Sequence, residues 1–202
     1  MGFFYLRCAI LFVVPARESN PAGSKLTLHV VSSLDGFIAK NDSDIAWMDA
    51  NQSVYEAGVS ISEVEAAAFV KTIDCYLLGS RTYEHSLELG WPYGDTPTVV
   101  VTTRNLRSTR SSVEFYSGEL GILIKDKLLP RYRNVWLVGG AKLCQDVLEL
   151  DLVDEMRLTI APILLGEGLR LFSGPLPEQL WDLKDVIAFK NGYAELTYAR
   201  QR

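Results

Sequence analysis

The segment 134–150, NVWLVGGAKLCQDVLEL, constrains the fold of this chain more than any other. Its apolar run ends in Gly139 and Gly140, and leucine and valine then recur at roughly helical spacing, so the segment predicts a strand, a tight turn and a helix. Two residues without Cβ let a ligand approach the backbone, and the first helical turn offers unpaired N–H groups to an anion. Lys142 adds a positive charge there.

This segment allows two interpretations. It lacks the full dinucleotide motif G-x-G-x-x-G, because Ala141 and Cys144 stand where further glycines would be. The glycine turn therefore either binds a phosphate group or only packs the helix tightly against the sheet.

The bulk properties fit one α/β domain that acts on a small molecule. The chain has 202 residues, of which 48% are hydrophobic, and a formal net charge of −5 without a basic block, so we expect no nucleic-acid partner. Cys8, Cys75 and Cys144 are odd in number and lack C-x-x-C spacing, so we expect neither disulfides nor a metal site. This cysteine usage is typical of a reducing compartment, and we expect a cytoplasmic protein.

The N-terminal stretch complicates that expectation. Residues 2–14 are almost entirely apolar apart from Arg7, and the sequence that follows loosely resembles a signal-peptidase site. The run is too short to span a membrane, so it is either a signal peptide or a non-native or poorly ordered extension. We predict a poorly ordered extension over 1–24 and a single domain over 25–202, with no membrane partner.

The rest of the chain predicts strands that alternate with helices. Predicted strands cover 25–32, 74–78, 96–103, 112–116, 134–138 and 153–165, and predicted helices cover 60–72, 80–89, 120–129 and 141–150. Pro162 indicates an edge position or a bulge in the last of these strands, and Asn191-Gly192 indicates a C-terminal hairpin. The fold class is therefore α/β, with a central mixed, mainly parallel sheet, helices on both faces and a C-terminal antiparallel hairpin.

Several polar residues follow predicted strands. The strand at 74–78 ends at Gly79 and begins a second strand-glycine-helix unit. The apolar strand at 96–103 ends in Thr103, and Arg104 comes next. Ligands of open α/β sheets bind beyond the carboxyl ends of the strands, where these turns meet. Thr103 and Arg104 either grip a phosphate there or are simply solvated.

Two further features each have two interpretations. Ser62 and Glu65 have the spacing of a capping box, and Glu63 beside them either serves the helix dipole or faces a pocket. Trp47 is either part of a lid over a pocket or a residue of a small satellite core.

Five stretches in a fixed order resemble a known family. SLDGFIA, LLGSRTYE, VVVTTRNL, VWLVGGAKL and RLTIAPILLGEGLRLF span residues 33–172, and together they resemble the dihydrofolate-reductase-like superfamily. The resemblance is to the C-terminal reductase domain of the riboflavin-biosynthesis deaminase-reductases in a stand-alone form. It implies a dihydrofolate-reductase-like fold, an NADPH-dependent reductase and a homodimer. The deaminase signature, H-x-E with P-C-x-x-C, is absent around both histidines, so the chain supplies at most the reductase half.

The resemblance also implies roles for particular residues. It places Gly139, Gly140, Ala141, Lys142 and Leu143 along the cofactor phosphates and nicotinamide, Arg81 and Thr82 at the pyrophosphate, Thr103 and Arg104 at the adenosine 2′-phosphate, and Asp35, Gly36 and Ile38 in a loop that closes over the nicotinamide.

The expected chemistry is hydride transfer to a polarised C=N or C=O carbon of a small heterocyclic or ribosylamino-pyrimidine substrate. The proton comes from Glu63, Asp35 or a held water, and the sequence does not choose among them. Two alternatives stay open: a pteridine- or dihydrofolate-type reductase, for which Glu63 and Phe69 are the candidates, and a non-catalytic NADPH-binding protein.

Overall fold

The computed structural model describes residues 23–49 and 54–201 of the chain. Most of the predicted extension over 1–24 therefore lies outside the described residues, as do the signal-peptide alternative and Cys8. Within the described part, no helix is long and apolar enough to cross a membrane.

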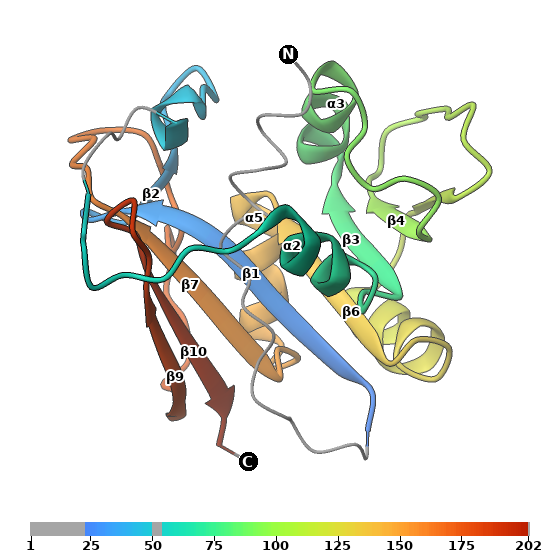
Figure 1. Cartoon of the computed structure of the whole chain (residues 1–202). Coiled ribbons are helices and arrows are strands. Elements are labelled where there is room, and N and C mark those ends of the chain that lie inside the picture. The colour runs from blue at the N-terminus through green and yellow to red at the C-terminus, as the bar shows by residue number, and fades with distance from the viewer. Residues whose placement is uncertain (1–22, 50–53, 202) are drawn as a thin grey trace.

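An eight-stranded sheet forms the centre of the molecule, in the order β5-β4-β3-β6-β1-β7-β10-β9 (Figure 1). The strands are β1 (Lys25–Ser33), β3 (Cys75–Gly79), β4 (Thr98–Val101), β5 (Val113–Tyr116), β6 (Asn134–Gly139), β7 (Glu155–Ala161), β9 (Trp181–Ala188) and β10 (Ala194–Arg200). All neighbours from β5 to β7 are parallel, and β10 is antiparallel to both β7 and β9. The predicted mixed, mainly parallel sheet and its C-terminal hairpin are thus confirmed.

Short elements complete the architecture. A two-stranded antiparallel sheet joins β2 (Phe37–Ala39) to β8 (Leu169–Arg170). The helices are α2 (Glu63–Val70), α3 (Ser80–Glu88), α4 (Leu120–Ile122), which continues into the π-helical η2 (Leu123–Leu128), α5 (Ala141–Glu149) and the 3₁₀ helix η1 (Ala46–Asp49). The predicted capping box begins α2, with Ser62 and Glu65 bonded to each other's backbone N–H groups.

Helices cover both faces of the sheet because the central strands present apolar side chains alternately to each side. Leu77 of β3 and Leu137 of β6 pack in the cluster that contains α5 and η2. Their neighbours Tyr76 and Trp136 pack in a second cluster with Phe69 of α2 and with α3. The sheet is therefore buried on both sides where it carries the glycine turns.

The structure corrects the interpretation of Pro162. β7 ends at Ala161, whereas the prediction extended this strand to residue 165. β7 also lies inside the sheet between β1 and β10, so Pro162 is at neither an edge nor a bulge. Proline has no N–H group to donate to a ladder, and the strand stops before it.

Candidate active site

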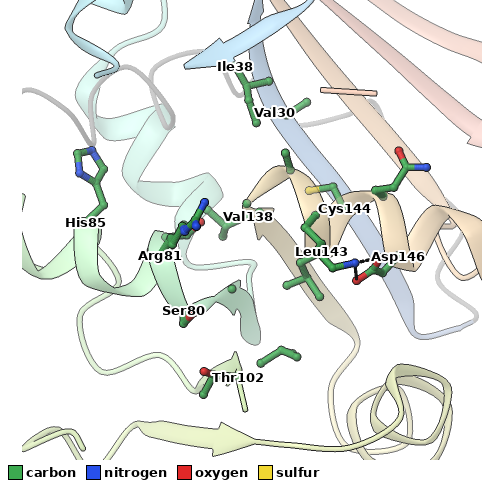
Figure 2. A pocket seen from close by; sticks show the side chains of 18 of the residues that line it. Val30, Ile38, Ser80, Arg81, His85, Thr102, Val138, Leu143, Cys144 and Asp146 are labelled. Atoms are coloured by element: carbon green, nitrogen blue, oxygen red, sulfur yellow. Dashed lines mark hydrogen bonds and ion pairs between the residues drawn. The ribbon is translucent and has the colours of Figure 1, made fainter. Parts of the chain in front are cut away.

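A cleft of about 1370 Å³ opens where β3, β4 and β6 end. Figure 2 shows Arg81 and His85 of α3 on one side and Leu143, Cys144 and Asp146 of α5 on the other. Drug-sized ligands usually occupy about 300–1,000 Å³. This cleft therefore has room for an extended ligand together with a second small molecule.

Both walls of the cleft begin as helix N-termini. Gly79 is the N-cap of α3 and Gly140 is the N-cap of α5, and neither has a side chain that could accept a hydrogen bond from the first N–H groups of its helix. Both glycines line the cleft, so the first N–H groups of two helices and the positive ends of their dipoles are available to an anion.

Close packing at the same point requires glycine. A Cβ on Gly140 would lie 3.3 Å from Oγ1 of Thr82, and Gly139 has a φ of +128°, which favours glycine. The peptide between Gly139 and Gly140 is cis. The glycine turn thus brings the start of α5 against the first turn of α3.

Two cations of the cleft lining, Lys142 and Arg104, each form an exposed ion pair. Lys142 contacts Asp146 at 2.8 Å, and its side chain is 87% exposed. Arg104 makes two hydrogen bonds to Glu84, with N–O distances of 2.8 and 2.6 Å. The guanidinium of Arg104 holds the pKa of Glu84 below its usual range. Exposed ion pairs contribute little stability, so an incoming phosphate could replace either carboxylate at small cost.

Part of the cleft lining is aromatic. His29, Tyr76, Tyr93 and Trp136 all belong to it. The ring of Trp136 lies 4.9 Å from that of His29 and 6.2 Å from that of Tyr76, which in turn lies 4.5 Å from Tyr93. Burial raises the pKa of both tyrosines, that of Tyr93 to about 12, so their hydroxyls stay neutral. We call these four residues the aromatic floor.

The structure brings most of the predicted cofactor residues to this cleft. The lining includes Ile38, Arg81, Thr82, Thr103, Arg104, Gly139, Gly140, Ala141, Lys142 and Leu143. The loop residue Gly36 is not among the described residues that line the cleft. Its carbonyl instead accepts a hydrogen bond from the backbone of Leu171.

Neither predicted acid belongs to the lining that the structure describes. The Asp35 carboxylate accepts hydrogen bonds from the Ser33 hydroxyl at 2.5 Å and from the backbone N–H groups of Leu165 and Gly166. These donors, that of Ser33 foremost, lower the pKa of Asp35 to about 2. Asp35 therefore ties the turn after β1 to the loop after β7. Glu63 is exposed at the first position of α2, where a carboxylate suits the helix dipole.

Trp47 is a core residue. It is buried with Val31, Phe189 and Tyr193, whereas its neighbours Ile45 and Met48 line the cleft. The satellite-core interpretation of Trp47 is thus the one that the structure supports.

The aromatic floor is not among the site residues predicted from the sequence. Trp136 lies in the segment that organised the prediction, and alternation could have placed it opposite Val135 and Leu137. His29 gave a weaker signal, a polar residue within an apolar strand. Its partners lie on β7 and β10, and the order of these strands could not be derived from the pattern.

Among the described residues, no group of three or more histidine, cysteine or acidic side chains is arranged to hold a metal ion. The buried cysteines Cys75 and Cys144 are free thiols, and burial raises the pKa of each to about 12.

Comparisons with known proteins agree on one family. The model of the RibD C-terminal domain family matches residues 24–194. The uncharacterized protein YwjB of Bacillus subtilis (strain 168) is 32% identical over 178 residues, which cover 87% of this chain and 98% of YwjB.

Solved structures give the same result. A Shewanella sp. PV-4 protein provisionally assigned to riboflavin biosynthesis has a TM-score of 0.74 and 25% identity, over 88% of this chain and 99% of that one. The Thermotoga maritima diaminohydroxyphosphoribosylaminopyrimidine deaminase/5-amino-6-(5-phosphoribosylamino)uracil reductase has a TM-score of 0.64 at 17% identity, over 89% of this chain and 57% of that longer one. At that identity the second likeness concerns the fold.

Proposed function

Because this chain belongs to the RibD C-terminal domain family, we propose that it is an NADPH-dependent reductase of a small heterocyclic substrate. The first candidate substrate is a ribosylamino-pyrimidine of the kind named for the Thermotoga maritima relative. The proposal concerns both the cofactor and the substrate.

The observation that carries the proposal is the pair of helix N-termini that face one cleft without side-chain caps. One uncapped helix would suit a single phosphate, and two that meet at Thr82 and Gly140 suit a pyrophosphate. Arg81 and Lys142 add charge on the two walls. Arg104 also lines the cleft, and in this proposal it binds the further phosphate on the adenosine ribose that distinguishes NADPH from NADH.

The same cleft contains room for the other half of such a cofactor. Gly139 and Trp136 both belong to β6 and both line the cleft. When bound, the dihydronicotinamide supplies a hydride. The chain's own part is to orient the acceptor carbon on the aromatic floor and to exclude water from it.

Binding of the two nucleotides tests the cofactor part of the proposal. The protein has four tryptophans, and Trp136 lines the cleft, so quenching of its emission reports occupancy. We expect Arg81→Ala to weaken the binding of NADPH and NADH alike by about ten- to a hundredfold, because both carry the pyrophosphate and a charge-assisted contact contributes roughly 1.5–3 kcal/mol. Arg104→Ala should weaken NADPH and leave NADH unchanged.

Arg107→Ala is the matched control, because Arg107 is exposed on the same loop as Arg104 and is not among the described lining residues. If neither nucleotide binds, the proposal fails and the glycine turns serve packing alone. If NADPH binds but reduces no pyrimidine or pteridine, the chain is a non-catalytic binding protein.

A further inference from the structure

A buried polar cluster lies directly behind the aromatic floor. Nε2 of His29 on β1 is 3.2 Å from Oγ1 of Thr159 on β7 and 3.4 Å from Oε2 of Glu195 on β10. Thr159 in turn donates to Oε2 of Glu195 at 3.1 Å. The three strands are neighbours, and the Cα atoms of Thr159 and Glu195 are direct ladder partners.

The carboxylate of Glu195 is buried, and only one of its two oxygens accepts a hydrogen bond among the described residues. Its side chain is 1% exposed, and Oε1 has no hydrogen bond among the described residues. The nearest guanidinium nitrogen, Nη1 of Arg157, is 3.7 Å from Oε1. Arg157 also contacts Glu155 at 3.2 Å, so Glu195 shares this cation with a second carboxylate. A buried carboxylate favours a further positive charge beside it, and His29 is the group placed to carry one.

The other charged and titratable groups of this region are few. Lys25 on β1 pairs with Glu155 on β7 at 2.9 Å, Arg157 lies over the ring of Phe69 of α2, and Tyr76 of β3 adjoins Trp136. The two cations and the two carboxylates cancel formally. The His29–Glu195 contact therefore adds an imidazole to a cluster whose other charges already balance.

His29 connects the buried cluster to the cleft. Nε2 carries the contacts to Thr159 and Glu195, and the His29 side chain is 2% exposed. No hydrogen bond is formed by Nδ1 within 23–49 and 54–201. His29 itself lines the cleft beside Trp136, whereas the predicted acids Asp35 and Glu63 lie outside the described lining. An acid at this position would stand at the substrate end, away from the phosphate-binding turns.

From this geometry we infer that His29 is the catalytic acid and that Glu195 is the positioning residue that keeps a proton on it. The inference rests on the proposed reductase function. The hydride forms a new C–H bond at the C=N or C=O carbon, and the π electron pair moves to the nitrogen or oxygen. That atom takes the proton from His29, which becomes neutral and regains a proton from solvent through the cleft.

Nuclear magnetic resonance of the histidine rings tests the Glu195 part without any substrate. The chain has two histidines, so ¹H–¹⁵N correlation of the imidazoles gives two sets of signals, assigned with His85→Gln. At about pH 6.5, we expect Glu195→Gln to reduce the protonated fraction of His29 roughly threefold or more and to leave His85 unchanged. In Glu195→Asp, which keeps the negative charge, the protonated fraction of His29 should lie between those of the wild type and Glu195→Gln. This second variant replaces Glu195→Gln in the test if Glu195→Gln does not fold.

Kinetics test the acid. With NADPH and 5-amino-6-(5-phosphoribosylamino)uracil, His29→Gln should lower kcat by roughly 10²-fold and remove the fall of the rate at high pH, with NADPH affinity within about twofold. Arg107→Ala, which changes an exposed residue outside the described cleft lining, should leave kcat unchanged.

An unchanged His29 signal in both Glu195 variants overturns the inference, and so does a His29→Gln enzyme of normal kcat. A wild-type protein that binds NADPH and reduces nothing removes the reaction, and with it the role of His29 as an acid. The ring signals separate this failure of the proposed function from a failure of the His29–Glu195 contact.

Discussion

At the level of single residues, the ion pair between Arg104 and Glu84 is the contact that a bound 2′-phosphate would have to open. Glu84 competes with the phosphate for the guanidinium and adds a negative charge beside it. We expect Glu84→Gln to raise NADPH affinity about two- to fivefold, with no change for NADH, because an exposed pair of this kind contributes about 0–1 kcal/mol. Fluorescence titration with both nucleotides measures the effect.

Glu88→Gln is the matched control, because Glu88 lies one turn further along α3 and contacts His85. An equal gain for NADH would show that Glu84 acts on the cleft as a whole and not through Arg104.

Asp35 leads to a prediction about stability and pH. Its folded-state pKa of about 2 lies below the ordinary value of 3.8, so its stabilising contribution is present above about pH 4 and is lost as the pH falls toward 2. Asp35→Asn should therefore lower the melting temperature most at neutral pH, and the difference from wild type should shrink on acidification. Thermal melts monitored by circular dichroism from pH 7 downward measure it.

Asp95→Asn provides the control on an exposed loop. A difference between wild type and Asp35→Asn that is constant with pH, or that grows toward acid, would contradict the assigned role of Asp35 as an anchor of the loop after β7.

The site residues that could be predicted are those whose role depends on the local backbone. The turn at Gly139 and Gly140 was predictable because a strand, two glycines and a helical repeat stand next to one another in the chain. His29 and Glu195 lie 166 positions apart, and they meet through the placement of β7 between β1 and β10. No local sequence pattern contains that strand order, so the buried cluster of His29 and Glu195 behind the aromatic floor could not be predicted.

At the level of elements, α2 depends on its capping box. The helix has eight residues, too few for an isolated helix to be stable, and Ser62 and Glu65 satisfy its first donors. We expect Ser62→Ala to lower the free energy of unfolding by about 1 kcal/mol. Urea denaturation measures the loss, and Ser60→Ala, at an exposed position just before the helix, should cost much less.

Nucleotide affinity should stay unchanged in Ser62→Ala, because α2 supplies no described residue of the cleft lining. A parallel loss of NADPH binding would mean that α2 shapes the cleft through Phe69 and Trp136, whose rings meet edge to face.

Helices and strands could be predicted where the spacing of the apolar residues was regular, but the residues at which they begin and end were harder to predict. The alternation of β1 and the apolar runs of β3, β4 and β6 marked strands correctly. The end of the strand predicted over 153–165 is wrong, because apolar residues continue past Pro162, where the hydrogen-bonded ladder stops. An apolar run indicates burial and not strand structure as such, and residues of the loop after β7 are partly buried too.

At the level of the whole molecule, we propose a homodimer formed through β9. This strand is an edge of the described sheet, and Leu183 and Val186 on it are 54% and 55% exposed. Val186→Glu should convert the dimer to a monomer in sedimentation velocity, because a carboxylate in a dimer interface would have to be desolvated. Val64→Glu, at an exposed aliphatic position on α2, is the control and should leave the dimer intact.

A monomeric wild-type protein, or a dimer that tolerates Val186→Glu, would contradict the β9 interface. The cleft and the cluster around His29 lie within one chain, so the reductase proposal does not depend on this result.

Transfer of deuterium tests the central claim most directly, namely that this cleft passes a hydride from NADPH to a heterocycle on the aromatic floor. NADPH carrying deuterium at the transferable position of the nicotinamide is incubated with 5-amino-6-(5-phosphoribosylamino)uracil, and the product is analysed by mass spectrometry. The account predicts a reduced product that carries one deuterium from the cofactor. Bound NADPH that yields no deuterated product from this compound or from a panel of pyrimidines and pteridines would contradict it.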